Sequence, residues 1–402
     1  MPSQTTPIQT TPASSGKPHY IMGIMSGTSC DGIDIAIMDA ATLRLAHFSE
    51  HLLPIELRES VLRLASPSFN EIDTLGHLDR ALGISFAQAA LDALAQSSIP
   101  AARILAIGNH GQTIRHRPFN LHGDYPFTLQ IGCAATLAER TGITTVSDFR
   151  RRDIAAYGQG APLVPFAHQQ LFARQEGATA IVNIGGIANI TMFNSDGSIQ
   201  GFDTGSGNMV MDALMLQISD GRHAYDREGH LAGMGEICPE LLASLLAHPF
   251  IRQTPPKSTG REDFGEKTVH HIMGWAGISD ADRMATACAF TVQSMVLQRP
   301  FLHSEAKEWL ICGGGAFNPT LLRMLQEALA PAHVTTTQQY GIPPEAVEAL
   351  SFALLAKQTL LGKPNTLPEV TGADHAVCGG QITPSNNWCD VIQWIMQQQH
   401  TA

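Results

Sequence analysis

Apolar and polar positions alternate in two short hairpins, one near the start of the chain and one near its middle. The first runs from apolar Ile21–Met25 through small polar Ser26–Gly32 into Ile33–Ile37, where isoleucines alternate with other side chains. An apolar run, a small polar turn and a returning segment with a period of two predict strand, turn and returning strand. Ala180–Phe193 repeats this pattern around Gly185–Gly186. Because each hairpin opens one half of the chain, we expect a duplicated domain.

Helical and strand-like segments follow the hairpins. Apolar residues at helical spacing predict helices over Ile55–Ala65, Leu75–Ala95, Ala134–Thr141, Ala285–Leu297, Thr320–Ala328 and Leu350–Leu361. Short apolar runs predict further strands at Arg103–Gly108, Thr128–Gly132, Ile143–Ser147 and Trp309–Cys312. The mixture predicts the α/β class, and a chain of 402 residues makes two domains the expectation.

The composition limits which binding partners and which cellular compartment are expected. A net charge of −11 argues against nucleic acid or an anionic membrane as the main partner. The seven cysteines are scattered without a CxxC pair, which favours a reducing compartment over a disulfide framework or a zinc site. No apolar run approaches the roughly 18 residues of a membrane span. Met1–Pro18 is rich in Ser, Thr and Pro without an apolar core, so we expect a disordered tail, not a signal peptide, and a cytoplasmic protein.

The turn of the first hairpin has the composition of an anion site. Glycines let backbone N–H groups approach an anion, and the hydroxyls of Thr28 and Ser29 add donors. Asp31 would repel phosphate unless a cation lay between them, so its presence favours Mg²⁺. An ordinary hairpin with Asp31 and Gly32 in its turn is the alternative. The turn is not a P-loop, because no Gly-Lys-Ser/Thr follows it.

His110 and Gln112 follow the predicted strand Arg103–Gly108 directly. Residues in that position lie at the carboxyl end of a strand, where open α/β sheets bind their ligands. Both side chains are therefore candidate substrate contacts.

A cluster of charges follows the predicted strand Ile143–Ser147. In Asp148–Asp153, three arginines stand between two aspartates. Because a guanidinium pairs with carboxylate or phosphate in a bidentate way, Arg152 and Asp153 are candidate ligand contacts. A solvated or structural charge cluster is the alternative. Gly158–Pro162 then forms a flexible passage, the best candidate for a hinge between domains.

Asp203 lies in the run of small residues Gly201–Asn208, ahead of a segment with helical character, Met209–Leu216. An acid at a strand end would point into the space that the two hairpins enclose. Its alternative role is to cap the helix or to hold the loop. Further along, Pro255–Asp263 is a proline-broken polar loop that we expect to be a mobile part of the substrate domain.

Three glycines, Gly313–Gly315, separate the predicted strand Trp309–Cys312 from a helix. Bare backbone at this place allows a flat ring to lie against it. The spacing suits a nucleoside better than the pyrophosphate turn of dinucleotide-binding proteins. Glu348 falls in the first turn of a later predicted helix, where it favours the helix dipole or faces the cleft.

Ten segments in order from Tyr20 to about Pro384, nearly the whole chain, carry a resemblance to a known family. They are Met25–Asp34, Gly108–Thr113, His116–Pro118, Asp148–Asp153, Gly158–Pro165, Val182–Ile190, Gly201–Gly205 with Gly207–Asn208, Pro255–Phe264, Cys312–Ala316 with Asn318–Pro319, and Glu348–Ala349 with Phe352. Two hairpins with Gly/Thr/Asp turns and a late triple glycine are the pattern of the sugar-kinase/heat-shock-chaperone/actin superfamily. Within it, the sequence closely resembles the anhydro-N-acetylmuramic acid kinases.

The resemblance implies a two-lobed actin-like ATPase fold of the ribonuclease H-like kind. Each lobe would be a mixed sheet flanked by helices, with the active site in the cleft between the lobes. We expect residues 1–18 as the tail, 19–160 as the N-terminal lobe and 161–402 as the C-terminal lobe. The final helix is a candidate to pack back toward the first lobe.

The resemblance also implies an activity. Family members phosphorylate 1,6-anhydro-N-acetylmuramic acid from recycled cell wall with ATP and Mg²⁺, and open the anhydro ring to give N-acetylmuramic acid 6-phosphate. It implies the sugar and ATP as partners, neither nucleic acid nor membrane, and a homodimer, which is common among relatives. A kinase of another amino sugar and a non-catalytic ATP-binding regulator are the alternatives. Intact Asp203 and Asp31 count against the regulator.

The family's functional positions carry over residue by residue. Asp203 matches the general base that takes a proton from a water attacking the anomeric carbon, and we expect its pKa to stay below neutral. Asp31 matches the magnesium contact. Nucleotide contacts are expected at Gly27, Thr28, Ser29, Cys30, Asp31, Gly32, Ile33, Asp34, Asn183, Gly185, Gly313, Gly314 and Gly315. Sugar contacts are expected at His110, Gln112, Arg152, Asp153 and Glu348, with Arg152 as the partner of the lactyl carboxylate.

Three positions depart from the family's usual pattern. Cys30 stands where an aliphatic residue is more usual, and we expect it to pack. Ser206 replaces a proline in the loop of Asp203, and Tyr157 replaces a glycine just before the predicted hinge. Cys30 is among the expected nucleotide contacts, but its thiol has no predicted chemical role, and neither do Ser206 and Tyr157.

Overall fold

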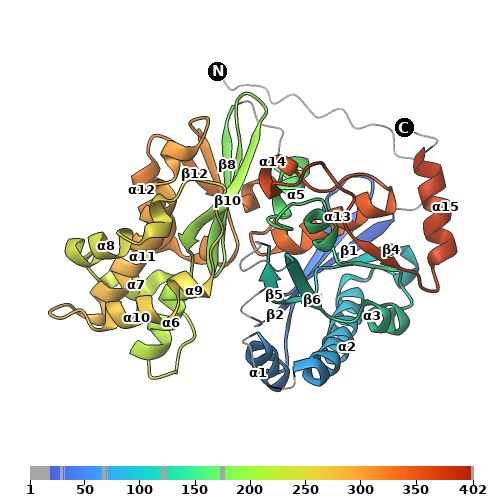
Figure 1. The fold of residues 1–402 in the computed structure, drawn as a ribbon, viewed down its shortest axis with the longest axis horizontal. Coiled ribbons are helices and arrows are strands. Elements are labelled where there is room, and N and C mark those ends of the chain that lie inside the picture. Colours follow the sequence, from blue (N-terminus) through green and yellow to red (C-terminus); the bar gives the residue numbers. More distant parts are fainter. Residues whose placement is uncertain are drawn as a thin grey trace.

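Two lobes, each a sheet flanked by helices, make up the computed structural model of the chain (Figure 1). The structure describes residues 19–27, 30, 32–65, 69, 71–118, 125–172 and 177–399. The predicted tail 1–18 lies outside these residues, as do Thr28, Ser29 and Asp31 of the predicted phosphate turn. The predicted α/β class is confirmed.

The first sheet has six strands in the order β13-β7-β4-β1-β2-β3. These strands are β1 (Tyr20–Met25), β2 (Gly32–Asp39), β3 (Leu45–Leu52), β4 (Ile104–Asn109), β7 (Thr145–Ser147) and β13 (Gln381–Thr383). The first three form an antiparallel meander, β4 runs parallel to β1, and β7 runs parallel to β4. A separate antiparallel ribbon, β5 (Gln112–Arg117) and β6 (Phe127–Ile131), lies on the side of this lobe that faces the other (Figure 1).

The second sheet repeats that plan with five strands in the order β10-β9-β8-β11-β12. They are β8 (Thr179–Ile184), β9 (Ile187–Phe193), β10 (Ile199–Ser206), β11 (Glu308–Cys312) and β12 (His333–Thr336). Again three strands form an antiparallel meander, β11 is parallel to β8, and β12 is parallel to β11. The same strand order in both sheets confirms the duplication predicted from the two hairpins.

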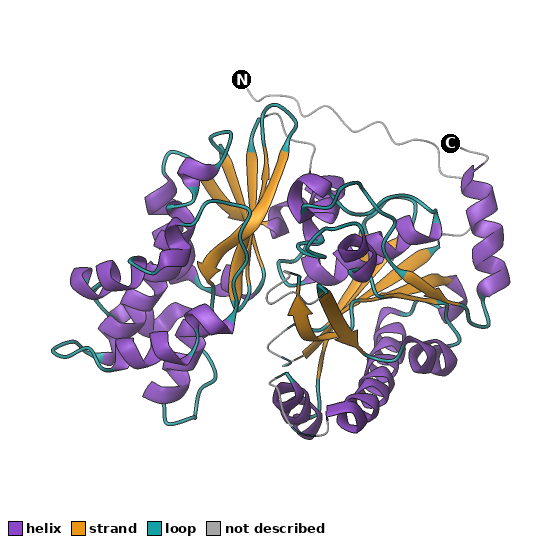
Figure 2. Cartoon of the chain, viewed as in Figure 1, coloured by secondary structure: helices purple, strands orange, loops and turns teal. Residues whose placement is uncertain are grey.

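Helices cover both sheets (Figure 2). Before the second sheet they are α1 (Ile55–Leu64), α2 (Glu71–Ser97), α3 (Ala134–Thr141), α4 (Arg151–Ala155) and α5 (Val164–Phe172). The later ones are α6 (Met209–Ile218), α7 (His230–Met234), α8 (Pro239–Leu246), α9 (Arg261–Phe264), α10 (Glu266–Met273), α11 (Asp280–Val296), α12 (Pro319–Leu329), α13 (Ala346–Leu360), α14 (Pro368–Thr371) and α15 (Trp388–Gln399). The apolar segment predicted as a core helix is α11, which is buried along most of its length. Within the described residues, no helix is both long and apolar enough for a membrane crossing.

Helix α13 packs on the first sheet although the strands before it belong to the second. Two strand glycines allow this. A Cβ on Gly23 would lie 1.8 Å from the carbonyl oxygen of Ala349, and one on Gly108 would lie 2.2 Å from that of Phe352. Only glycine lets the strand backbone approach the helix so closely. The edge strand β13 joins the same sheet and α15 contacts β4, so these elements lie on the first lobe, whereas α14 between them contacts β10 of the second.

Candidate active site

A buried glutamine hydrogen-bonds the turn after β1. Gln112 is fully buried, and its Nε2 donates to the carbonyl of Gly27 at 3.1 Å. The hydroxyl of Ser26 lies 2.8 Å from Oε1 of Gln112 and 3.0 Å from the carbonyl oxygen of Gly32. Gln112 therefore supports the predicted phosphate turn from the protein side. Cys30 is buried, as expected for a packing residue.

The second hairpin turn is joined to the start of α6. The N–H of Asn208 donates to the carbonyl of Gly185 at 2.8 Å, and its Nδ2 donates to the carbonyl of Ile184 at 3.1 Å. A Cβ built on Gly185 or Gly186 would meet no atom closer than 3.7 Å. The turn is therefore fixed at its base and open at its outer face, as a phosphate cradle requires.

The triple glycine follows β11 and lies beside the end of β8. Gly313 has a φ of 76°, and a Cβ there would lie 2.3 Å from Oδ1 of Asn183. A Cβ on Gly315 would lie 2.4 Å from Cγ2 of Ile184. Both positions need glycine because the backbone approaches β8 too closely for a side chain. The structure thus brings together Asn183 and Gly313–Gly315, which the sequence placed in one nucleotide site.

Asp203 lies at a bulge in β10 and is hydrogen-bonded to the loop that follows η3 (Pro249–Arg252). Its N–H donates to the carbonyl of Lys257 at 3.1 Å, and the N–H of Thr259 donates to its Oδ2 at 2.9 Å. Burial raises the pKa of Asp203 to about 7, against the lowering effect of the Thr259 N–H and the Lys257 charge. The expectation of a pKa below neutral is therefore wrong. Loss of hydration raises the pKa of the carboxylate by more than its hydrogen bond from Thr259 and the charge of Lys257 lower it.

A cavity of about 60 Å³ between the lobes opens onto Asp203. Its walls include His116 of β5, Pro162 in the passage between the lobes, and Lys257. Among the described residues that line the cavity, Asp203 is the only carboxylate, and it lies where residues of both lobes meet.

In the wild-type protein, ionisation of Asp203 should lower the free energy of unfolding as the pH rises from 4 to 7. Asp203→Asn is expected to remove this decrease. The folded pKa of about 7 exceeds the ordinary 3.8, so between pH 4 and 7 the folded protein holds a proton that the unfolded chain releases. Wild-type stability should therefore fall as pH rises through this window, by on the order of a few kcal/mol. Lys257, with a pKa of about 8, stays charged throughout it. Melting temperatures of both proteins from pH 4.5 to 7 test this, and parallel curves would contradict the raised pKa.

Arg150 forms the centre of a second group of charges. Its Nε and Nη2 lie 3.2 and 2.9 Å from Nε2 of His110, and its Nη1 donates to the carbonyl of Gly160 at 2.9 Å. Burial lowers the pKa of Arg150 to about 10, while the carboxylates of Glu348 and Asp153 oppose that shift. Burial also raises the pKa of Glu348, and the charge of Arg150 acts against it.

His110 is a neutral acceptor in this group. Burial, followed by the charge of Arg150, holds its pKa well below the ordinary value. Its ring lies against Phe352 of α13, with 4.7 Å between centroids. The charge of Arg150 also lowers the pKa of His116, after the larger effect of burial. His116 thus links the Arg150 group with the cavity of Asp203.

The other two predicted contacts in this stretch have structural bonds. Arg152 is exposed and donates to the carbonyl of Cys378 at 3.1 Å. Asp153 is fully buried, and its two oxygens accept from the N–H of Gly160 at 2.7 Å and the hydroxyl of Thr371 at 2.8 Å. Asp153 therefore ties α4 to the passage between the lobes and to α14.

Sequence reasoning missed Arg150, His116 and Lys257. For Arg150 the signal was its place directly after buried Phe149, at the end of the apolar strand segment. Of the two departures near the site, Tyr157 has a φ of 67°, in the left-handed region that glycine adopts without strain. Ser206 is buried at the end of β10.

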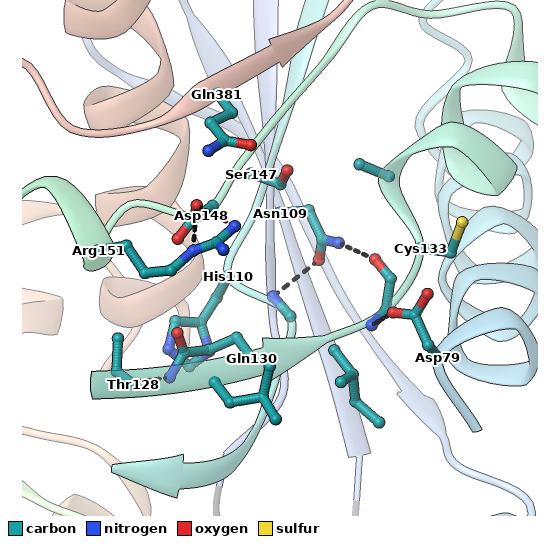
Figure 3. Close-up of a pocket in the computed structure, with 15 residues that line it drawn as sticks. Asp79, Asn109, His110, Thr128, Gln130, Cys133, Ser147, Asp148, Arg151 and Gln381 are labelled. Carbon is teal, nitrogen blue, oxygen red and sulfur yellow. Dashed lines mark hydrogen bonds and ion pairs between the residues drawn. The ribbon is translucent and has the colours of Figure 1, made fainter. Parts of the chain in front are cut away.

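A second, larger cavity of about 240 Å³ lies in the first lobe beside His110 (Figure 3). Amides, hydroxyls and carboxylates line it: Asp79, Asn109, Thr128, Gln130, Ser147, Asp148 and Gln381, with Arg151 bound to Asp148. Asn109 is fixed by bonds of 3.1 Å to the carbonyl of Gly132 and from the N–H of Gly111. Neutral amides and carboxylates of this kind suit the hydroxyls of a sugar.

Comparison with known proteins gives a consistent answer. A sequence profile of the anhydro-N-acetylmuramic acid kinases matches residues 19–385. The anhydro-N-acetylmuramic acid kinase of Saccharophagus degradans is 45% identical over 375 residues, covering 92% of this chain and 100% of the relative. That of Vibrio parahaemolyticus is 41% identical over 368 residues, covering 91% and 98%.

Solved structures of lower similarity include the ADPNP-bound activator of a 2-hydroxyisocaproyl-CoA dehydratase from Clostridium difficile. It has a TM-score of 0.43 and 10% identity, and covers 84% of this chain and 94% of that one. A ROK family glucokinase from Streptomyces griseus with glucose and AMPPNP has a TM-score of 0.39 and 12% identity, over 84% and 99%. The profile and the identities above 40% along nine-tenths of the chain show that it belongs to the anhydro-N-acetylmuramic acid kinase family.

Proposed function

We propose that this protein uses ATP to convert 1,6-anhydro-N-acetylmuramic acid into N-acetylmuramic acid 6-phosphate. The observation that carries the proposal is Asp203, on a cavity between the lobes of a chain from this family, with its backbone N–H bonded to the carbonyl of Lys257 and its carboxylate bonded by the N–H of Thr259. In the reaction, water adds to the anomeric carbon and the bond from that carbon to the bridging oxygen breaks. The freed oxygen on carbon 6 forms a bond to the γ-phosphorus, and ADP leaves.

Asp203 acts as the base for the attacking water. A general base works best when its pKa lies near the working pH, and the pKa of about 7 meets that condition. The Thr259 N–H bonds one oxygen of the carboxylate, which holds its plane while the other oxygen takes the proton.

The nucleotide is proposed to lie over the glycine turns. Gly185–Gly186, where a built Cβ would meet no atom closer than 3.7 Å, are proposed to lie against phosphate, and Gly313–Gly315, packed beside the end of β8, against the nucleoside. Asp31 is the proposed Mg²⁺ contact, because it matches the magnesium contact of the family to which the chain belongs. Magnesium commonly takes one or two carboxylates together with phosphates and water, so a single aspartate fits. The ion would neutralise phosphate charge.

The activity is tested by mass spectrometry of products formed from ATP, Mg²⁺ and the anhydro sugar in ¹⁸O-water. We expect one label at carbon 1 of the sugar and none in the phosphate. Label in the phosphate would show ATP hydrolysis instead. Turnover of ordinary hexosamines without the anhydro sugar would point to another amino-sugar kinase, and nucleotide binding without turnover would point to a regulator. Light scattering tests the proposed homodimer, and cell fractionation tests a cytoplasmic role in cell-wall recycling.

The acid limb of the kcat/KM profile should fall near pH 7. Below that value Asp203 is protonated in the free enzyme and cannot accept a proton, so the rate should drop about tenfold per pH unit. Initial rates from pH 5.5 to 9 at low sugar concentration measure it. A kcat/KM that stays constant down to pH 5.5 would show that Asp203 is not the group that accepts the proton.

Arg152→Ala is expected to raise the KM for the sugar roughly tenfold or more, because a bond to a charged ligand group is lost. The kcat and the KM for ATP should stay unchanged. Arg152 is exposed, so its guanidinium can meet a ligand from solvent. Steady-state kinetics with each substrate varied in turn measures the effect. An unchanged KM for the sugar would show that Arg152 does not bind the lactyl carboxylate and would leave Arg150 as the candidate.

A further inference from the structure

Lys257 is a buried lysine whose ammonium group binds carbonyls and aromatic rings. Only 5% of the residue is exposed. Its Nζ donates to the carbonyls of Phe250 at 3.1 Å and Ile251 at 3.3 Å. It also lies over the rings of Phe250 and Phe301, 4.7 and 5.5 Å from their centroids. A buried cation is costly unless such groups replace water, so this arrangement is a built site and not a chance burial.

The backbone of Lys257 and of Thr259 hydrogen-bonds Asp203. The carbonyl of Lys257 accepts from the N–H of Asp203, and the N–H of Thr259, two residues on, donates to its carboxylate. The side chain of Thr259 is itself fixed by a bond of 2.6 Å to Asp263. The segment that orients Asp203 is therefore anchored through Lys257 to η3 and, through Phe301, to η4 (Arg299–Phe301).

We infer that Lys257 is a positioning residue for the proposed reaction: its side chain anchors the loop that orients the Asp203 carboxylate and supplies the neighbouring positive charge. The inference rests on the proposed function, because it concerns the base of that reaction. It gives a role to the Pro255–Asp263 loop, which sequence reasoning treated only as a mobile segment. In the structure this loop is tied to Asp203 and to the core of the second lobe.

The electrostatics of the site agree with this geometry. After burial, the carboxylate of Asp203 is the group that acts on the pKa of Lys257, and Lys257 in turn lowers the pKa of Asp203. Across the cavity the titratable group is His116, whose pKa of about 4 leaves it neutral near pH 7. The other residues of the cavity wall, including Val370 of α14, carry no charge. Lys257 is therefore the cation that this lining presents to Asp203.

Three substitutions separate the anchor from the charge. Lys257→Met removes both the donors and the charge, Lys257→Gln keeps a donor without the charge, and Lys257→Arg keeps both. Lys267→Met, on an exposed residue of α10, is the matched control. Two quantities are measured for each: the pH profile of kcat/KM, and the titration of the Asp203 carboxyl by ¹³C NMR in the absence of substrates. Asp203→Asn assigns the NMR signal.

We expect the Met and Gln variants to raise the apparent pKa of Asp203 by about one unit, since a nearby cation is lost. Their kcat at pH 6.5 should fall about tenfold or more, with the KM for ATP unchanged. The Arg and Lys267→Met variants should titrate as wild type does. An unchanged Asp203 titration in both neutral variants would overturn the inference. So would activity that falls only in proportion to the folded fraction, with the pH profile unmoved.

The two proposals fail in different ways. If the wild-type protein does not convert the anhydro sugar, the proposed function fails, whereas the NMR titration still measures the coupling between Lys257 and Asp203. If the sugar is converted and the neutral variants titrate as wild type does, only the role of Lys257 fails. Should Lys257→Met not fold, Lys257→Gln carries the same charge test with a donor retained.

Discussion

Asp203→Asn is expected to lose between about 10²- and 10⁴-fold in kcat, the usual contribution of a general base. The amide keeps the shape of the side chain and can still accept the bond from Thr259, so the loop around it should stay in place. What it lacks is the capacity to take a proton from water. Dissociation constants for ATP and for the sugar should therefore change little, which calorimetry can measure beside single-turnover rates.

Asp212→Asn is the matched control for this loss. Asp212 lies in the first turn of the helix that follows the Asp203 strand, so it belongs to the same part of the fold. Its substitution should leave kcat within about twofold, as is usual away from the reacting atoms. Near-normal turnover in Asp203→Asn would exclude Asp203 as the base. A large loss in both variants would indicate damage to the lobe and not to the chemistry.

The parts of the site that depend on local backbone were predictable from the sequence. The second hairpin turn and the glycines after β11 lie where the apolar pattern stops, whereas Asp203, expected at a strand end, lies at a bulge inside β10, which continues to Ser206. A strand end is a local event, set by a few residues. Gly313 shows this well, since a triple glycine after a buried strand already indicates backbone that something must approach.

Contacts set by distant elements were not predictable in the same way. Three consecutive arginines carry equal chemistry, and which one turns inward depends on where β7 stops and α4 begins. Arg150 precedes α4 and turns toward His110, whereas Arg151 and Arg152 lie on its exposed side. Lys257 in a polar loop reads as exposed, and its burial depends on Phe301, far along the chain. Gly23 and Gly108 were a usable signal for close packing on the first sheet, although they do not say which helix packs there.

Arg150→Met is expected to reduce both stability and activity. The guanidinium bonds His110 and the carbonyl of Gly160, and it faces the carboxylates of Glu348 and Asp153. Methionine fills much of the space but leaves Glu348 without its cationic neighbour, so the pKa of Glu348 should rise further. Breaking a buried ion pair costs on the order of 3 kcal/mol, and Arg150 and Glu348 are half-buried and coupled only through their charges, so the loss should stay below this. Urea unfolding at pH 7 measures it.

Activity should fall about 100-fold or more in kcat/KM, because His110 and Glu348 both lose the group that holds them. The double variant Arg150→Met/Glu348→Gln separates the two effects. With the charge of Glu348 also removed, much of the lost stability should return, since Asp153, the other carboxylate that acts on Arg150, keeps its hydrogen bonds from Gly160 and Thr371. Activity should not return, because the cation and the carboxylate are both missing from the site. If the double variant recovered activity together with stability, Arg150 and Glu348 would be a structural pair with no part in binding the sugar.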